Sequence, residues 1–468
     1  MPWNLFEKVD IKKSRSFSEA RFVVLSGEFL KSGVALPFGA KHLRAAALRE
    51  FYLYKGKDFW SKAKITLLRI FNLDFVWWFV FRKKVFVDKN EEIFSFLASK
   101  TKFEEPVTFS VYSGSRKYIL PIFGEKSGKL LSVAKVYFPG RESEIYGENE
   151  AKILDYLQKL DIPGFSFPRV LAKDYFRGAL VIILSPPPPS SETKHSNILP
   201  KARWLGQLGP KARWLGQLGP KARWLGQLGP KARWLGQLGQ NVGMFGGTRG
   251  IDAIKNCHLD FLKKLSDKTK EEKIFTESNF YNEIQSELSF LQSKMSNERF
   301  KSIKYFFDKA VDNLNSKSFI FSLTKREFPF FEMLCVAAPS SSMFNVLSSK
   351  FFVIDWEQAR FGFPQIFDLY SLIISGGRFK KGNYVELYER NIQDLFFIKN
   401  TKIQSILDCM LKFWNIEKGD AYYFFLLYLV DQLYIHLHVN HELSASRVTA
   451  LFEKISKNEN KFRNNWLP

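Results

Sequence analysis

Apolar positions in the second hundred residues of the chain predict a small antiparallel β-sheet. Three runs rich in Val, Ile, Leu, Phe and Tyr extend from Val107 to Tyr112, from Lys117 to Phe123 and from Leu130 to Phe138. Short segments that contain Ser, Gly and Lys separate these runs, which is typical of hairpin turns. A further apolar run, Ala179 to Leu184, predicts a strand at the end of this region.

Helical periodicity dominates much of the remaining chain. Ala151, Leu154 and Leu157 recur at helical spacing and predict a helix from Glu148 to Leu160. After a β-like section at residues 318–354, helices are expected again. The helices predicted in the C-terminal half are His258 to Ser266, Asn279 to Met295, Glu298 to Leu314, Asp420 to Val439 and Ser444 to Ile455. The pattern as a whole indicates the α+β class.

The first 105 residues are basic and aromatic, and the pattern predicts an extra helical region there. Helices are expected at Ala40 to Leu53 and at Trp60 to Phe71. The apolar run from Ile65 to Phe81 is barely long enough to cross a membrane, and it contains Arg69 and Asp74. Charged residues inside so short a run argue against a transmembrane helix.

An aromatic cluster beside basic residues leaves two interpretations open. Trp77 and Trp78 precede the run Arg82-Lys83-Lys84. Aromatic rings next to positive charge can bind an anionic membrane surface, which would place the protein at the inner face of the membrane. The alternative is a buried apolar element with a solvated, charged end.

Residues 191–249 are predicted to be a low-complexity linker that follows the prolines Pro186 to Pro189. The unit Pro-Lys-Ala-Arg-Trp-Leu-Gly-Gln-Leu-Gly occurs four times from Pro200 to Gly239. One Pro and two Gly per unit suit neither a continuous helix nor a solenoid. The repeats are either a late, dispensable insertion or a flexible basic arm that contacts anions. The other expected parts of the chain are residues 1–105, 106–190 and 250–468.

Net charge and cysteine content narrow the choice of partners and compartment. The formal net charge is +23. The four repeats contribute two positive charges each, so the rest of the chain still carries +15, which favours an anionic partner. No nucleic-acid-binding motif occurs, so no specific nucleic-acid partner is expected. Three cysteines without metal-ligand spacing fit a reducing, cytoplasmic location.

The segment that begins at Phe352 carries the most specific chemistry of the sequence. Its motif is Ile354-Asp355-Trp356-Glu357, followed by Gly362, Pro364 and Asp368-Leu369. A carboxylate at the end of an apolar strand can hold Mg²⁺ against nucleotide phosphates. This motif resembles the metal-binding segment of the aminoglycoside phosphotransferase family, which is related to choline kinases. The resemblance implies a protein-kinase-like, two-lobe fold, with Asp355 as the Mg²⁺ ligand and Asp368 as a structural carboxylate that steadies the catalytic loop. Asp368 is also predicted to open the next helix, at a cap position.

The expected catalytic loop lies about 25 residues upstream, but its chemistry is altered. Family members have Thr-His-Gly-Asp or Thr-His-Arg-Asp, then Phe, two residues, Trp and Asn. Thr324 and Phe328 keep that frame, whereas Lys325 replaces His, Glu327 replaces the Asp that orients the acceptor hydroxyl, and Glu332 replaces the metal-binding Asn. Glu keeps an oxygen ligand and a base but places it one methylene further out. The loop is therefore that of a variant active kinase or of a protein that has lost catalysis.

The predicted sheet offers residues for the nucleotide. By the same resemblance, Lys135 is a phosphate-contacting lysine and Glu150 is its partner on the following helix. The residues of the loop that would cover the phosphates are Ser113, Gly114, Ser115 and Arg116, and residues 184–189 would form the adenine-binding hinge.

The sequence thus predicts an ATP- and Mg²⁺-dependent phosphotransferase. Its acceptor would be a hydroxyl group of a small molecule, with a sugar or glycan precursor as one candidate. The alternative is a pseudokinase-like binding or regulatory module, which in one version is peripheral to a membrane.

Overall fold

The computed structural model of the protein describes the residues 5–6, 10–12, 22–26, 34–37, 41–50, 84–86, 91–101, 103–114, 116–187, 256–326, 333–336, 350–376, 401–438, 442–457 and 459. The chain forms two compact units. The first contains Met1–Asp161, Ser166–Pro189 and Ile354–Gln358, and the second contains Ile162–Phe165, Ser190–Val353 and Ala359–Pro468. The segment that carries Asp355 therefore belongs to the first unit, although its sequence neighbours belong to the second.

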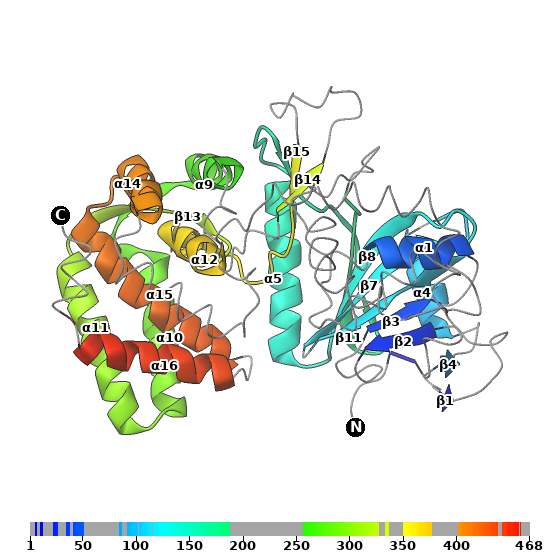
Figure 1. Ribbon diagram of the computed structural model, residues 1–468, viewed down its shortest axis with the longest axis horizontal. Helices are drawn as coiled ribbons and strands as arrows, with labels where there is room; N and C mark the ends of the chain where they lie inside the picture. Colours follow the sequence, from blue (N-terminus) through cyan, green and yellow to red (C-terminus); the bar gives the residue numbers. More distant parts are fainter. Residues whose placement is uncertain are drawn as a thin grey trace, which may run out of the picture. The chain divides into compact units, whose positions relative to one another are not determined.

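Antiparallel pairing joins the strands of the first unit into one sheet (Figure 1). The strand order is β1-β4-β2-β3-β6-β7-β8-β11-β10, and β5 pairs with β7. The bounds are Asp10–Lys12 (β1), Phe22–Ser26 (β2), Val34–Pro37 (β3), Lys84–Phe86 (β4), Val107–Phe109 (β5), Val111–Ser113 (β6), Lys117–Gly124 (β7), Leu130–Tyr137 (β8), Val170–Phe176 (β10) and Ala179–Leu184 (β11). All six residues of β11 are buried, which explains its continuous apolar run.

Helix α5 (Arg141–Leu157) packs against strands β8, β10 and β11 of this sheet. It begins seven residues before the predicted start at Glu148, after Gly140. Its first turns carry several charged residues, so apolar periodicity becomes visible only further along the helix. Gly147 permits close packing, because a Cβ atom there would lie 2.6 Å from Leu180 and 2.7 Å from Tyr137.

The described part of residues 1–105, where an extra helical region was predicted, contains both helices and strands. Helix α1 (Lys41–Glu50) lies inside the predicted helix, and α4 (Glu92–Thr101) was not predicted. The other described elements are the strands β1 to β4, which extend the sheet beyond β6. These strands have only three to five residues, too few for a clear period. Their side chains gain burial through distant partners, as when Phe22 packs against Phe6 and Phe109.

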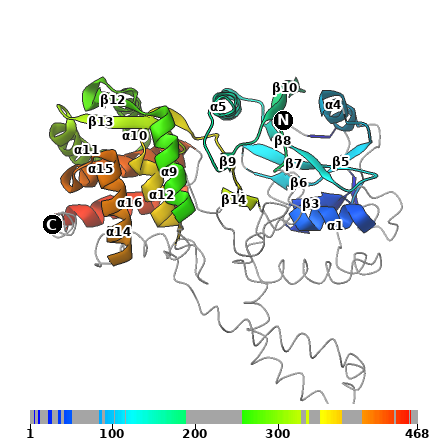
Figure 2. The same ribbon diagram turned by 90° about the horizontal axis from the view of Figure 1, so that it is seen from above.

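The second unit is mainly helical (Figure 2). Its α-helices include α9 (Asn256–Thr269), α10 (Asn279–Lys294), α11 (Asn297–Leu314), α12 (Ile366–Gly376), α14 (Thr401–Trp414), α15 (Lys418–His438) and α16 (Glu442–Lys457). Helix α15 is buried along most of its length and contacts α10, α11, α12 and α16. A helix that is apolar on all sides needs such central packing.

Two small sheets accompany these helices. Their orders are β12-β13-β16 and β14-β15-β9. The bounds are Glu271–Ile274 (β12), Ser318–Thr324 (β13), Arg360–Pro364 (β16), Met333–Val336 (β14), Lys350–Val353 (β15) and Phe165–Ser166 (β9). An antiparallel N-terminal sheet followed by a helical C-terminal part confirms the predicted α+β class and its protein-kinase-like order of elements.

Candidate active site

Lys135 and Glu150 form a buried ion pair in the first unit. Lys135 lies on β8 and Glu150 on α5, and Lys135 Nζ donates to Glu150 Oε1 at 2.6 Å. Tyr137 is two residues further along β8 and so lies on the same face of the sheet. Its hydroxyl donates to Glu150 Oε2 at 2.7 Å. Both carboxylate oxygens of Glu150, whose side chain is 1% exposed, are thereby paired. The two residues that the sequence predicted as partners are brought together.

Asp355 completes a contact triad with this pair. It follows β15, and its Oδ1 atom lies 3.1 Å from Lys135 Nζ. The next residue, Trp356, is fully buried, and its backbone N–H donates to Glu150 Oε1 at 3.3 Å. The Asp355 side chain, by contrast, is 40% exposed. The structure thus holds the main chain of this segment firmly and leaves a carboxylate accessible beside Lys135.

Two charged residues that were not predicted as site residues extend the triad. Lys117 contacts Glu357 Oε2 and lies 3.6 Å from Asp355 Oδ1. Arg116 Nη2 lies 3.6 Å from Glu357 Oε1. The six residues that alternate in charge are Glu150, Lys135, Asp355, Lys117, Glu357 and Arg116, and we call them the charge row. Two signals could have revealed the missed pair. Glu357 is two residues after Asp355, and Lys117 directly follows the predicted loop.

The charge row holds its buried members in their ionised forms. Burial alone would lower the pKa of Lys135, but the carboxylates of Asp355 and Glu150 raise it well above its ordinary value. Burial opposes the ionised form of Glu150, yet Lys135 and Lys117 lower its pKa overall. Burial also raises the pKa of Tyr137, with Glu150 as the next cause, so the phenol stays protonated and remains a donor. The Lys135–Glu150 pair is therefore charged near neutral pH.

The predicted phosphate loop is a tight hairpin between β6 and β7. Gly114 N–H donates to Lys117 O at 3.0 Å, and a Cβ atom on Gly114 would lie only 3.1 Å from that oxygen. Arg116 lies over the ring of Tyr146, with 4.1 Å from its guanidinium carbon to the ring centroid. Ser113 Oγ and Arg116 Nη1 are buried without a hydrogen-bond partner among the described residues. Ser115 lies outside the described part of the chain.

A second buried cluster anchors the start of the predicted catalytic loop, within the second unit. The Lys325 N–H donates to Asp368 Oδ2 at 2.9 Å, and the Arg326 N–H also binds this carboxylate. The Arg326 guanidinium donates to Glu287 Oε1 at 2.5 Å and contacts Asp431. Asp368 thus steadies this loop as the resemblance implied. It is not a cap, however, because α12 begins two residues earlier at Ile366.

Glu327 and Glu332, the predicted catalytic base and second metal ligand, lie outside the described residues. The chain is described up to Arg326 and again from Met333, at the start of β14. Their proposed roles therefore rest on the sequence pattern.

The donor set suits the Mg²⁺ ion that the resemblance implies. Mg²⁺ prefers oxygen ligands and usually takes one or two carboxylates together with waters and substrate phosphates. Asp355 offers one partly exposed carboxylate of that kind. Among the described residues, no three His, Cys, Asp or Glu side chains form a group that could hold a metal. A single accessible carboxylate fits a metal whose other ligands are waters and substrate phosphates.

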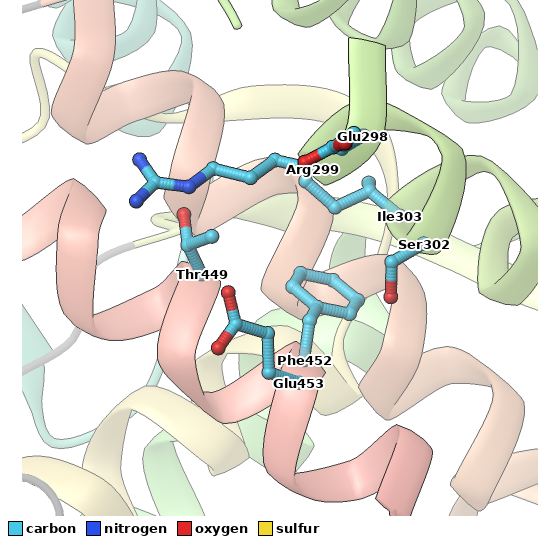
Figure 3. A pocket seen from close by; sticks show the side chains of 7 residues that line it. All are labelled: Glu298, Arg299, Ser302, Ile303, Thr449, Phe452 and Glu453. Atoms are coloured by element: carbon cyan, nitrogen blue, oxygen red, sulfur yellow. The ribbon is translucent and has the colours of Figure 1, made fainter. Parts of the chain in front are cut away.

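The second unit contains a cavity that none of these site residues lines. It has a volume of about 210 Å³ and opens between α11 and α16 (Figure 3). Its lining consists of Glu298, Arg299, Ser302, Ile303, Thr449, Phe452 and Glu453. It includes no residue of the charge row or of the predicted catalytic loop, so we do not assign it to the candidate site.

The described part of the chain contains no helix that is long and apolar enough to cross a membrane. The aromatic residues 75–81 and the adjoining Arg82-Lys83 lie outside that part, and Lys84 begins β4. The prediction of a membrane-surface contact is therefore untested.

Similarity to known proteins is found among solved structures. No model of a protein family matches the sequence, and a search of curated proteins finds no match. Three similar solved structures illustrate the likeness. A thermostable mutant of aminoglycoside phosphotransferase APH(4)-Ia, in ternary complex with AMP-PNP and hygromycin B, is 12% identical. That match has a TM-score of 0.42 and covers 78% of this chain and 98% of the other.

Spectinomycin phosphotransferase APH(9)-Ia, in complex with ADP and spectinomycin, is 13% identical. It has a TM-score of 0.32 and covers 78% of this chain and 93% of its own. A putative fructosamine-3-kinase from Haemophilus somnus is also 13% identical, with a TM-score of 0.32 and coverage of 76% and 96%. These are the kinds of protein that the sequence motifs suggested.

Proposed function

We propose that the protein transfers the γ-phosphoryl group of ATP to a hydroxyl group of a small molecule, with a sugar or glycan precursor as one candidate acceptor. One observation carries this proposal. Lys135 Nζ is 2.6 Å from buried Glu150 and 3.1 Å from accessible Asp355. In protein kinases, a lysine paired with a helix glutamate and an aspartate that holds Mg²⁺ must both be in place for phosphoryl transfer, and these three residues supply such groups.

In this function the charge row binds and orients the nucleotide. Lys135, fixed by Glu150, donates to phosphate oxygens, and the loop Ser113 to Arg116 covers them. Asp355 would hold Mg²⁺, which when bound would neutralise charge that develops on the phosphates. Most of the rate enhancement then comes from positioning and charge stabilisation.

The loop after Arg326 supplies the acceptor side. Glu327 orients the acceptor hydroxyl and takes its proton as the oxygen–phosphorus bond forms. The bond between the γ-phosphorus and the bridging oxygen breaks, and its electron pair leaves with ADP. Glu332 would be a second oxygen ligand for the metal. Both roles follow from the position of these residues in the catalytic-loop pattern.

A second candidate function is nucleotide binding without turnover. Two observations favour it: Lys325 and Glu327 depart from the family's loop, and the charge row is already balanced by three cations and three carboxylates. A protein of this kind would act through partners, and the proposed acceptor would not exist.

Calorimetric titration of ATP with Mg²⁺ into the wild type and into Asp355→Ala tests the proposal. We expect binding to the wild type and at least a tenfold weaker affinity in the variant, because a metal ligand is lost. No binding to either protein would contradict a nucleotide function altogether. Glu327→Asp separates the two candidates. Increased ATP turnover supports an enzyme, whereas binding without turnover in both proteins supports the binding module.

A further inference from the structure

Lys117 is placed as a second lysine beside the same Asp355 oxygen that Lys135 contacts. Lys117 Nζ lies 3.6 Å from Asp355 Oδ1, and Lys135 Nζ lies 3.1 Å from it. The two lysines come from the adjacent strands β7 and β8, where Lys117 is opposite Tyr137. Phosphates bound at Lys135 and Asp355 would therefore come within reach of Lys117.

Glu357 now neutralises Lys117, but few other groups hold its carboxylate. The Tyr137 hydroxyl is 3.3 Å from Glu357 Oε2 and 2.7 Å from Glu150 Oε2. A phenol has one proton, so it donates to the nearer carboxylate. The closest approach of Arg116 is 3.6 Å, which is longer than a normal hydrogen bond. The Glu357 carboxylate is thus held mainly by Lys117.

The main chain at Glu357 is held by contacts that do not involve its own side chain. Asn149 Nδ2 on α5 donates to the Glu357 carbonyl oxygen at 3.0 Å, and the preceding residue, Trp356, is fully buried. A change of side-chain rotamer would therefore release the carboxylate from Lys117 without moving the backbone.

Unsatisfied donors lie on the neighbouring loop. Arg116 Nη1 and Ser113 Oγ are buried and have no hydrogen-bond partner among the described residues. Buried donors normally have partners, and each such exception calls for an explanation. Arg116 directly precedes Lys117, so its Nη1 atom is a donor with spare capacity in the loop next to that lysine.

We propose that Lys117 is a second phosphate-binding lysine of this site and that Glu357 is an internal carboxylate which a phosphate chain displaces from it. The inference rests on the proposed function, because it assigns phosphate to the same site. Glu357 and a phosphate next to Lys117 would repel each other, so the carboxylate leaves when the phosphate binds. Because Glu357 competes for Lys117, the wild type should bind free phosphate chains more weakly than a protein in which Lys135, Lys117 and Arg116 were all available to them.

The test is a titration with two probes, ADP and tripolyphosphate, first with EDTA and then with Mg²⁺. Without Mg²⁺ we expect Glu357→Gln to bind both probes about tenfold more tightly, and Lys117→Met to bind them about tenfold more weakly, as for one charge-assisted contact. The double variant should show no gain from Glu357→Gln, because the competition acts through Lys117. Matched controls are Lys173→Met and Glu148→Gln, which break an exposed ion pair of the same unit.

Tripolyphosphate separates this inference from the proposed function, since it needs no adenine-binding hinge. If ATP fails to bind the wild type while Glu357→Gln binds tripolyphosphate more tightly, the kinase proposal fails and the inference stands. If folded Lys117→Met and Glu357→Gln bind tripolyphosphate like the wild type, the inference is overturned. The inference is also overturned if Glu357→Gln binds the probes more weakly than the wild type when Mg²⁺ is present but not when EDTA is present. Glu357 would then be a metal ligand. Should Lys117→Met not fold, the result for Glu357→Gln decides.

Discussion

A non-glycine residue with a left-handed backbone lies in each of the two loops that carry candidate site residues, at Arg326 and at Asp355. Four non-glycine residues of the described chain have a positive φ angle. Arg177 lies in the two-residue turn between β10 and β11, and Asn415 follows the end of α14, so both have ordinary explanations. Arg326 and Asp355, each with φ of 66°, do not. Such strain persists where the surrounding contacts impose it, and here these are the buried contacts around the two residues.

Removing the ammonium group of Lys135 should destabilise the fold, because the carboxylate of Glu150 would stay buried without its ion-pair partner. In Lys135→Met, Glu150 loses its main partner while it stays buried, so we expect the free energy of unfolding to fall by about 3–5 kcal/mol. Urea denaturation measures this change. The double variant Lys135→Met with Glu150→Gln should recover most of the loss. Equal stability of the single and double variants would show that the pair does not have this role.

Asp368 predicts a specific dependence of stability on pH. Burial raises its pKa to about 7, although hydrogen bonds from Lys325, Arg326 and Gln365 oppose the shift. The folded protein therefore keeps a proton that the unfolded chain releases near its ordinary value of 3.8. The stability from this residue is complete below about pH 4 and is lost as pH rises to about 7, by roughly 4 kcal/mol in total.

Comparison of the wild type with Asp368→Asn isolates this contribution. We expect the free energy of unfolding, measured from pH 4 to pH 8, to fall more steeply with pH in the wild type than in the variant up to about pH 7. Above that pH the difference between the two proteins should stay constant. Parallel curves over the whole range would mean that Asp368 ionises normally in the folded protein.

At the scale of helices and strands, the position of α5 on the sheet sets the geometry of the Lys135–Glu150 pair. Gly147 is one turn before Glu150, and an added Cβ atom would meet the buried side chains of Leu180 and Tyr137. Gly147→Ala should therefore push α5 outward. We expect a loss of about 1–3 kcal/mol in stability and weaker binding of ATP with Mg²⁺.

The control for this prediction uses the same helix. Replacing Gly by Ala inside a helix normally stabilises it by up to about 1 kcal/mol. Lys152→Ala, at an exposed position of α5, reports any general effect of substitution on this helix. A more stable Gly147→Ala variant with unchanged binding would show that the helix does not need this close approach.

For the chain as a whole, the repeat array is the segment whose removal is predicted to matter least. Deletion of residues 200–239 removes eight positive charges and joins parts of the linker that follows β11. We expect the melting temperature and the affinity for ATP with Mg²⁺ to stay within experimental error of the wild type. A fall in affinity that high salt reproduces in the wild type would instead identify the repeats as a basic arm that contacts the anion.

Much of the fold could be predicted because its patterns are local. Turn residues between apolar runs gave the hairpins β6–β7 and β7–β8, and helical spacing gave α10, α11 and α15. The strands β1 to β4 could not be predicted in this way. They are short, and their apolar residues acquire a partner only when distant segments pair in the sheet.

The candidate site divides in the same way between the sequence and the tertiary structure. The sequence by itself determined which groups are available: a lysine on a strand, a glutamate on the next helix and an aspartate after a distant strand. Tertiary structure alone decided that Asp355 and Glu357 join the first unit, more than 200 residues from Lys135 and Lys117. Ion pairs depend on distances of a few ångströms, and only the folded chain fixes such distances between remote residues.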